Sequence, residues 1–145
     1  MIDFLIVETG DGGDLVLENE DLKTTNSFSN QIYFALFGGN FNSENGEQNN
    51  EYWANTFLPE ENKYVSTFEK TLNEVTLNSS GLEKLTNAVN SDLSFLKKYV
   101  NYTIDLSILD ENSLYLYIVI KAPNNVEEKN HIIWNNELKK ITSWQ

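Results

Sequence analysis

The sequence lacks cysteine and arginine altogether, and each absence excludes a class of protein. Without cysteine there can be no disulfide and no thiolate metal site, so packing alone must hold the fold. The positive charges are ten lysines, spread thinly against 22 acidic residues, which gives a formal net charge of −12. A protein that binds nucleic acid needs a basic stripe that displaces counterions. We therefore expect no nucleic-acid partner.

Long hydrophobic runs are also lacking. No stretch approaches the roughly 20 apolar residues that cross a bilayer, and an acidic surface disfavours anionic membranes. The first eight residues have no positive region, and their apolar run is too short for a signal peptide. We expect no membrane partner and no secretion by that route. A length of 145 residues predicts one domain with one core.

Groups with catalytic chemistry are scarce as well. The single histidine, His131, lacks the sequence context of a hydrolase triad or a zinc site, so an exposed or rim position is expected for it. The Gly-Asp segment over residues 10–14 has neither the spacing of a calcium loop nor the lysine of a phosphate loop. It predicts a plain hairpin turn. We expect no enzyme activity, no metal and no cofactor.

Two rival functions remain open. Glu60 and Glu61 lie near Trp53 and Phe57, and a glycosidase needs two carboxylates about 5 to 10 Å apart, one of them with a raised pKa. With 22 acidic residues in the chain, two near an aromatic side chain are also expected by chance. The other rival is a small inhibitor whose acidic surface imitates nucleic acid and binds a basic partner.

The clearest pattern covers residues 80–122. Apolar residues first recur three or four positions apart, which predicts one stripe on a helix: Leu82, Leu85, Val89, Leu93, Leu96 and Val100. From Val100 to Ile108 the period becomes two, as in a strand with one dry face. Residues 110–113 break that strand, and a second run from Leu114 ends before Pro123. The pattern predicts a helix lying on an antiparallel hairpin.

Shorter elements surround this block. Two apolar runs, Asp3–Thr9 and Asp14–Glu18, flank a glycine-rich turn and predict a hairpin. A cap at residues 25–27 predicts a helix that Gly38-Gly39 ends. A polar connection over residues 40–63 leads to a further helix over 66–77. The predicted class is α+β, with helices packed on an antiparallel sheet and a small C-terminal β-hairpin.

The C-terminal hairpin is predicted from two short runs around Asn135-Asn136. We expect a domain over residues 1–122 and a hairpin extension over 123–145, packed on it or projecting from it. The extension has more apolar surface than so small a hairpin can hide, and a polar loop with aromatic residues must bury them somewhere. The predicted partner-binding residues are Tyr52, Trp53, Phe57, Ile132, Ile133, Trp134, Ile141 and Trp144.

The order of motifs over the first 122 residues resembles the Mu-type phage protein family of contractile-tail baseplates, which is related to the lysozyme-like wedge proteins. The motifs are an N-terminal strand, a hairpin with the sequence Gly-Asp-Leu, and a second short segment of acidic residues followed by leucine. After these come a helix that ends in Leu-Phe, a polar loop with an aromatic residue next to Trp, and a block of two helices and two strands. In this chain they are Gly13-Asp14-Leu15, Glu20-Asp21-Leu22, Ile32 through Leu36-Phe37, Tyr52-Trp53-Ala54-Asn55 and the block that ends at Ala122.

The resemblance implies a non-enzymatic structural role in a phage tail or tail-like particle. The expected partners are other baseplate wedge proteins and the tail sheath, with several copies in a symmetric assembly. The chain would lie in the baseplate of the particle, and in the host cytoplasm during assembly. It departs from the Glu-Pro-Arg signature of the wider group, because it has no arginine. The contacts of that arginine are therefore not carried over.

Overall fold

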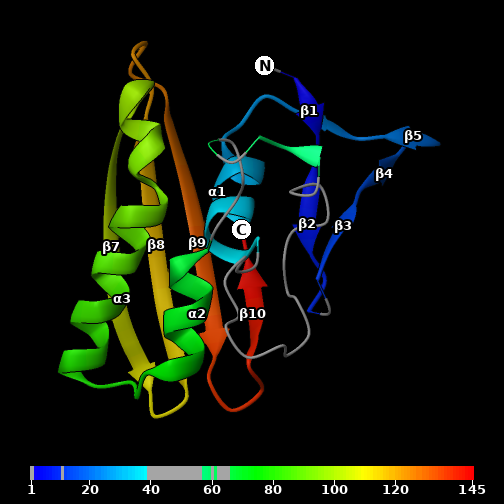
Figure 1. The fold of residues 1–145 in the computed structure, drawn as a ribbon. Coiled ribbons are helices and arrows are strands. Elements are labelled where there is room, and N and C mark those ends of the chain that lie inside the picture. Colours follow the sequence, from blue (N-terminus) through cyan, green and yellow to red (C-terminus); the bar gives the residue numbers. More distant parts are fainter. Residues whose placement is uncertain (1, 11, 39–56, 60, 62–65) are drawn as a thin grey trace. The chain divides into compact units, whose positions relative to one another are not determined.

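The computed structural model describes residues 2–10, 12–38, 57–59, 61 and 66–145. The described residues form helices and antiparallel strands, which confirms the α+β class (Figure 1). The chain forms two compact units: residues 1–30 together with 96–145, and residues 31–95. None of the described helices is long and apolar enough to cross a membrane.

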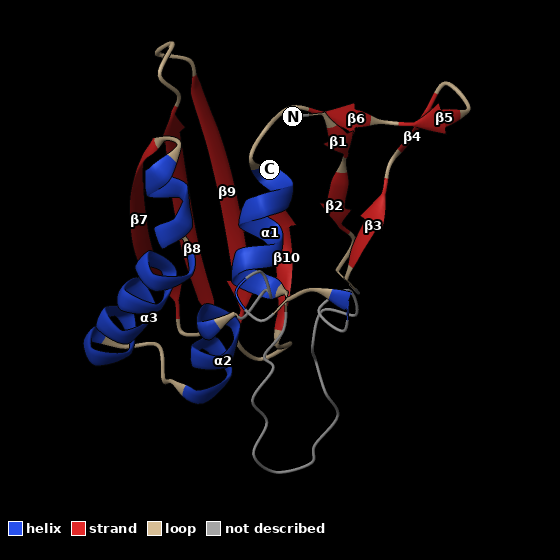
Figure 2. Ribbon diagram, turned by 45° about the horizontal axis from the view of Figure 1, so that its top comes forward, coloured by secondary structure: helices blue, strands red, loops and turns tan. Residues whose placement is uncertain are grey.

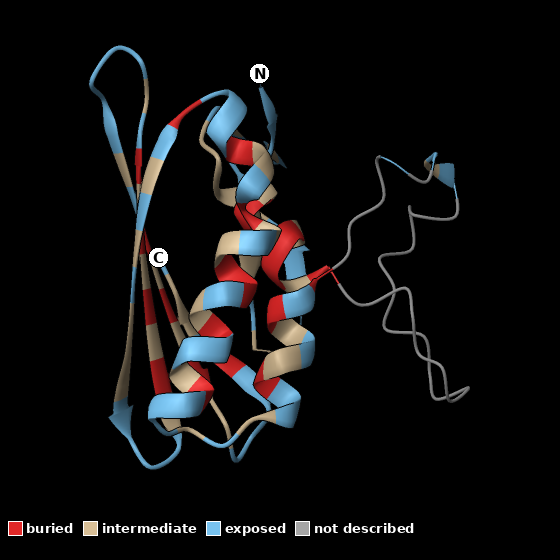
Figure 3. Ribbon diagram, turned by 60° about the vertical axis from the view of Figure 1, so that its left-hand side comes forward, coloured by how far each residue is buried: buried red, intermediate tan, exposed pale blue. Residues whose placement is uncertain are grey.

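The first unit contains a four-stranded antiparallel sheet with the order β10-β9-β8-β7. Its strands are β7 (Asn101–Asp110), β8 (Ser113–Lys121), β9 (Glu127–Asn135) and β10 (Lys140–Trp144). The predicted hairpin of two strands is confirmed as β7 and β8, with Ile104 opposite Ile118. The alternating pattern produces one buried face, because the even-numbered residues of β8 from Leu114 to Ile120 are buried and its odd-numbered residues are less so (Figure 3).

The predicted C-terminal hairpin is confirmed as β9 and β10, and it belongs to the same sheet. Strand β9 pairs with β8 from Ser113–Asn135 to Lys121–Glu127, so it lies inside the sheet and not beside it. The expected boundary at residues 122/123 falls in the turn between these two paired strands. Ile132 and Trp134 are buried because they lie opposite Leu116 and Leu114 and therefore share the buried face of the sheet.

The N-terminal part of the first unit contains six very short strands. These are β1 (Asp3–Phe4), β2 (Ile6–Glu8), β3 (Gly13–Leu15), β4 (Leu17–Glu18), β5 (Asp21–Leu22) and β6 (Thr24–Thr25). The predicted hairpin is confirmed where β2 pairs with β3. Each predicted run contains a second strand outside this hairpin. The run Asp3–Thr9 also contains β1, which pairs with β6, and the run Asp14–Glu18 also contains β4, which pairs with β5.

Most of the second unit's described residues lie in helices. Its helices are α2 (Thr67–Glu74), α3 (Ser79–Asp92) and most of α1 (Ser29–Phe37), which ends just before Gly38 as the sequence predicts. Ser66 caps α2, and its hydroxyl also donates to the carbonyl of Leu36. The Phe37 and Phe68 rings meet edge to face, 5.7 Å apart.

The predicted apolar stripe after residue 80 is buried at Leu85, Val89, Leu93 and Leu96. Helix α3 ends at Asp92, and a 3₁₀ helix, η3 (Ser94–Lys98), follows it. A 3₁₀ turn repeats every three residues, so the stripe continues although the α-helix has ended. Whether these helices lie on the sheet, as the sequence predicts, involves both units and stays a prediction.

Candidate interaction surfaces

The six short strands meet at a point that we call the three-strand junction, residues 2–25. Three backbone hydrogen bonds close a ring at its centre. Leu5 N–H donates to the carbonyl of Lys23 (2.8 Å), Lys23 N–H to that of Val16 (2.8 Å), and Val16 N–H to that of Leu5 (3.3 Å). Three two-stranded arms leave this ring, and Figure 2 shows the β4–β5 arm pointing away from the β2–β3 arm.

The β4–β5 arm is a tight hairpin. Leu17 lies opposite Leu22, Glu18 lies opposite Asp21, and two residues connect them. Both connecting residues have positive φ, 53° at Asn19 and 68° at Glu20, as a type I′ turn requires. Lys23 binds Glu18 at 2.9 Å beside this turn.

The β2–β3 arm ends in the glycine-rich turn. Glu8 Oε1 accepts hydrogen bonds from the backbone N–H groups of Gly10 (2.7 Å) and Gly12 (3.1 Å). The φ angles of these glycines are +91° and +123°, which side chains with a Cβ rarely adopt. The turn is therefore organised around a carboxylate of its own chain. Among the described residues, no three histidine or acidic side chains gather in a way that could hold a metal ion.

Asn30, which is 2% exposed, ties the junction to the start of α1. Its amide donates to the carbonyl of Phe4 (2.6 Å), and its side-chain oxygen accepts from Ile6 N–H (3.1 Å). Two residues earlier, Phe28 N–H donates to both carboxylate oxygens of Glu128 at 3.0 Å, which joins this segment to β9. The sequence did not identify Asn30 or Glu128. No local pattern indicates that a polar side chain forms hydrogen bonds with backbone groups far away in the sequence.

The junction exposes apolar side chains although its backbone is paired. Four large apolar residues within 16 positions are exposed by about half or more: Ile2 (77%), Phe4 (49%), Leu15 (46%) and Leu17 (72%). Leu15 lies opposite Ile6, and Leu17 lies opposite Leu22, so each forms a cross-strand apolar pair. Single exposed apolar residues are normal on a surface, whereas large contiguous apolar patches mark interaction sites. The junction is a candidate surface because its exposed apolar residues come from three neighbouring short strands and the segment before them.

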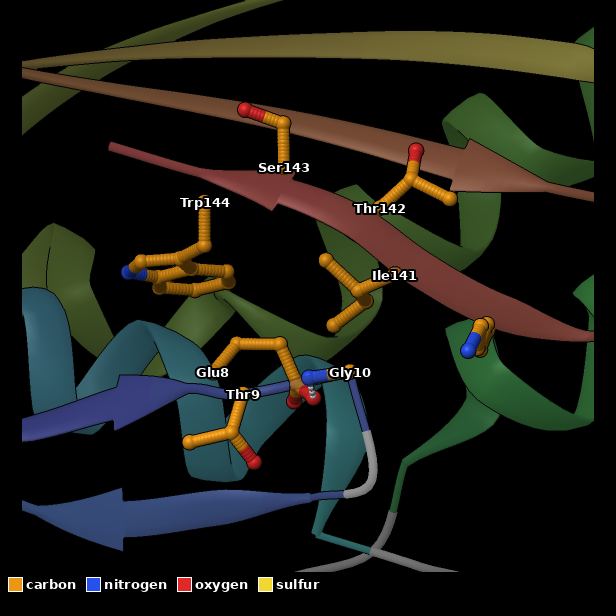
Figure 4. A pocket seen from close by; sticks show the side chains of 8 residues that line it. Glu8, Thr9, Gly10, Ile141, Thr142, Ser143 and Trp144 are labelled. Carbon is orange, nitrogen blue, oxygen red and sulfur yellow. Dashed lines mark hydrogen bonds between the residues drawn. The ribbon is translucent and has the colours of Figure 1, made fainter.

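A pocket of about 340 Å³ lies between the β2–β3 turn and β10. Figure 4 shows the Trp144 and Ile141 side chains pointing toward Glu8 and Thr9, whereas Thr142 and Ser143 point the other way. An irregularity in the β9–β10 register between Ile141 and Ser143 accounts for this, because an extra residue returns Trp144 to the side of Ile141. The half-buried Trp144 thus packs within its own unit.

A cluster of three rings lies on the less buried face of the sheet. The hydroxyl of Tyr115 lies 2.5 Å from Nδ1 of His131, and the rings of Tyr117 and His131 are centred 4.6 Å apart. His131 is partly exposed in the middle of β9, opposite Tyr117, rather than at the exposed or rim position that the sequence predicts. The hydrogen bond with Tyr115 and the ring contact with Tyr117 account for its orientation.

The predicted partner-binding residues fall into four groups. Tyr52 and Trp53 lie outside the described residues, and Phe57 is 80% exposed. Ile132, Trp134 and Ile141 are 5% exposed or less, and Ile133 and Trp144 are intermediate. The expected surplus of apolar surface on the C-terminal hairpin is therefore not found, because the hairpin buries it within the sheet. Of the rival glycosidase pair, Glu60 lies outside the described residues and Glu61 is exposed.

No family model, curated protein or solved structure matches this chain.

Proposed function

We propose that this chain is a non-enzymatic structural component of the baseplate of a contractile phage tail or tail-like particle. It assembles with wedge proteins and contributes to sheath attachment. The observation that carries the proposal is the three-strand junction, which pairs its backbone within the chain but presents Leu15 and Leu17 to solvent. An element of this kind has little to stabilise it alone, since two-stranded pairs are marginal in water.

The motif resemblance supports the same role. The Gly-Asp-Leu motif forms β3, and the motif Glu20-Asp21-Leu22 contains β5, so both motifs lie in the exposed arms of the junction. Motif residues that are exposed suit contact with a partner better than a role in the core.

A second surface suits assembly through strand pairing. Strand β7 is ten residues long and forms one edge of the sheet, with β8 as its hydrogen-bonded neighbour and no other within the described part of the chain. Exposed strand edges bind a further strand from another chain in β-augmentation. In the proposed assembly, a neighbouring subunit adds a strand to β7.

Mass spectrometry of purified particles tests the proposal. The chain should be present at a constant ratio to a second tail component after density-gradient purification, and deletion of its gene should yield particles without an attached sheath. Absence from the particles, together with normal particles after deletion, would overturn the proposal. Peptidoglycan hydrolysis by the purified chain that is lost in Glu60→Gln or Glu61→Gln would overturn the non-enzymatic role.

A further inference from the structure

The charge of the three-strand junction is as distinctive as its exposed apolar residues. Residues 1–30 carry seven acidic side chains and one lysine, so half of the chain's formal net charge of −12 lies in about a fifth of its length. Nζ of Lys23, the single basic residue in this segment, lies 2.9 Å from Oε1 of Glu18. A concentrated negative field of this kind steers a positively charged partner and repels a negative one.

The acidic and apolar side chains are close together in the sequence of each arm. Asp14 precedes the exposed Leu15 in β3, and Glu18 follows the exposed Leu17 in β4. Asp14 and Asp21 are exposed, and each accepts a hydrogen bond from the next residue's N–H through Oδ1, at 2.7 and 2.8 Å. These bonds orient the carboxylates relative to the backbone. Successive residues of a strand point to opposite faces, so each arm carries its exposed leucine on one face and the neighbouring carboxylate on the other.

The backbone of the junction favours docking through side chains. At its centre, the backbone N–H and carbonyl groups of Leu5, Val16 and Lys23 are hydrogen-bonded to one another. They are therefore not available to pair with a strand of a partner. An apolar recess on the partner would accept the leucine side chains, and basic groups around the recess would bind the carboxylates.

We infer that the three-strand junction docks into an apolar recess of another protein, and that lysine or arginine side chains surround this recess. The inference rests on the proposed function for the identity of the particle, but its surface chemistry comes from the junction alone. A second copy of this chain is disfavoured as the occupant, because two junctions of formal charge −6 would repel each other. The same sign disfavours nucleic acid and anionic membranes.

Reconstitution of particles tests the inference. Particles from a strain that lacks the gene are mixed with the purified wild-type chain or a variant, and incorporation is measured after gradient purification. Leu17→Ser removes a 72% exposed apolar side chain, and the double variant Asp14→Asn with Asp21→Asn removes two charges but keeps the Oδ1 acceptors. Each should lower incorporation by about tenfold, as interface anchors do.

Matched controls exist elsewhere in the same unit. Leu138→Ser changes a 57% exposed leucine, and Glu137→Gln changes an exposed carboxylate in the same turn between β9 and β10. Both should incorporate like wild type. Normal incorporation of the junction variants beside normal wild type would overturn the inference and leave the proposed function intact. Failure of the wild type itself would count against the proposed function.

A defined probe tests the surface without particles. Amide shifts in NMR spectra are recorded on the full chain with a synthetic peptide of alternating lysine and leucine, and with a lysine-serine peptide as the control. The Lys-Leu peptide should shift amides of residues 2–25 in a salt-sensitive way, and Leu17→Ser should weaken this shift. Shifts confined to other residues, or a homodimer in light scattering that Leu17→Ser dissolves, would overturn the inference.

Discussion

At the scale of single residues, Gly81 shows how a close backbone approach can override helix propensity. It lies in the first turn of α3, and its N–H donates to Oδ1 of the capping Asn78 at 2.9 Å. A Cβ at this position would lie 3.2 Å from the carbonyl carbon of Thr76 and closer still to the carbonyl oxygen. That oxygen also accepts from Asn78 N–H at 2.9 Å, which holds it in place.

We predict that Gly81→Ala lowers the free energy of unfolding by about 1 to 3 kcal/mol, because crowding the Thr76 carbonyl outweighs the gain of about 1 kcal/mol in helix propensity. Urea unfolding of the variant measures this. Ser80→Ala, one position earlier and exposed, serves as the control and should change stability by less than about 0.5 kcal/mol. A stabilised Gly81→Ala would show that the Thr76 carbonyl can move aside.

Asp92 combines burial with helix capping. Its carboxylate accepts from the N–H groups of Phe68 (2.7 Å) and Thr67 (3.1 Å) at the start of α2. Burial raises the pKa of Asp92 above the ordinary 3.8, although these two hydrogen bonds act in the opposite direction. The folded protein thus binds the proton more tightly than the unfolded chain does.

The sign of the pH dependence follows from this raised pKa. Between 3.8 and the raised pKa the folded state holds more protons, so the stability of wild type relative to Asp92→Asn should fall as the pH rises through that window. Urea unfolding of both proteins between about pH 3 and pH 6 measures the difference, in which the other titrations cancel. A difference that grows with pH would mean that the hydrogen bonds outweigh burial.

At the scale of elements, the strands β9 and β10 are part of the sheet and not an accessory. The pairing of β9 with β8 runs from residue 113 to residue 121, and buried Leu116 lies opposite buried Ile132. Removal of the last two strands would expose this apolar face and leave the β8 edge unpaired. The sequence favoured a removable hairpin, since nothing local shows that a strand has neighbours on both sides.

We predict that truncation after Asn125 abolishes the cooperative unfolding transition instead of leaving a folded, assembly-deficient domain. Circular dichroism and thermal unfolding check this. The milder variant Trp134→Ala removes a side chain that is 5% exposed, and should cost about 3 to 5 kcal/mol. A truncated chain that keeps a cooperative transition would show that β7 and β8 do not need β9.

The sequence predicted the elements with regular periodicity and missed those without it. Alternation along residues 101–110 and 113–121 identified β7 and β8, and the glycines after Phe37 identified the end of α1. These signals are local, so one chain suffices to detect them.

The three-strand junction was missed because its pairings are short and distant. Phe4 pairs with Thr24 across 20 positions, and two-residue strands have no period to detect. The β4–β5 turn was hidden because Glu20 occupies a positive-φ position where glycine is usual. The motif Glu20-Asp21-Leu22 was visible in the sequence, but it did not reveal that Asp21 and Leu22 pair with β4.

At the scale of the whole molecule, the excess of acidic over basic residues opposes compaction. With a formal net charge of −12 at pH 7, like charges repel in the folded state more than in the extended chain. We predict that added sodium chloride raises the melting temperature at pH 7 by a few degrees, as calorimetry would show. Near the sequence pI of about 4.3 the net charge vanishes, so the same salt should have less effect there. A salt effect of equal size at both pH values would contradict this account.

The division of the first unit between the two ends of the sequence has a consequence for biosynthesis. Strand β2 contacts β10, so residues 6–8 cannot complete their surroundings until residues 140–144 have left the ribosome. At roughly 5 to 20 residues per second, that interval is on the order of ten seconds. Throughout it the nascent N-terminus, acidic and apolar, is accessible to chaperones, whereas the adjacent strands β7 and β8 can pair as soon as both emerge.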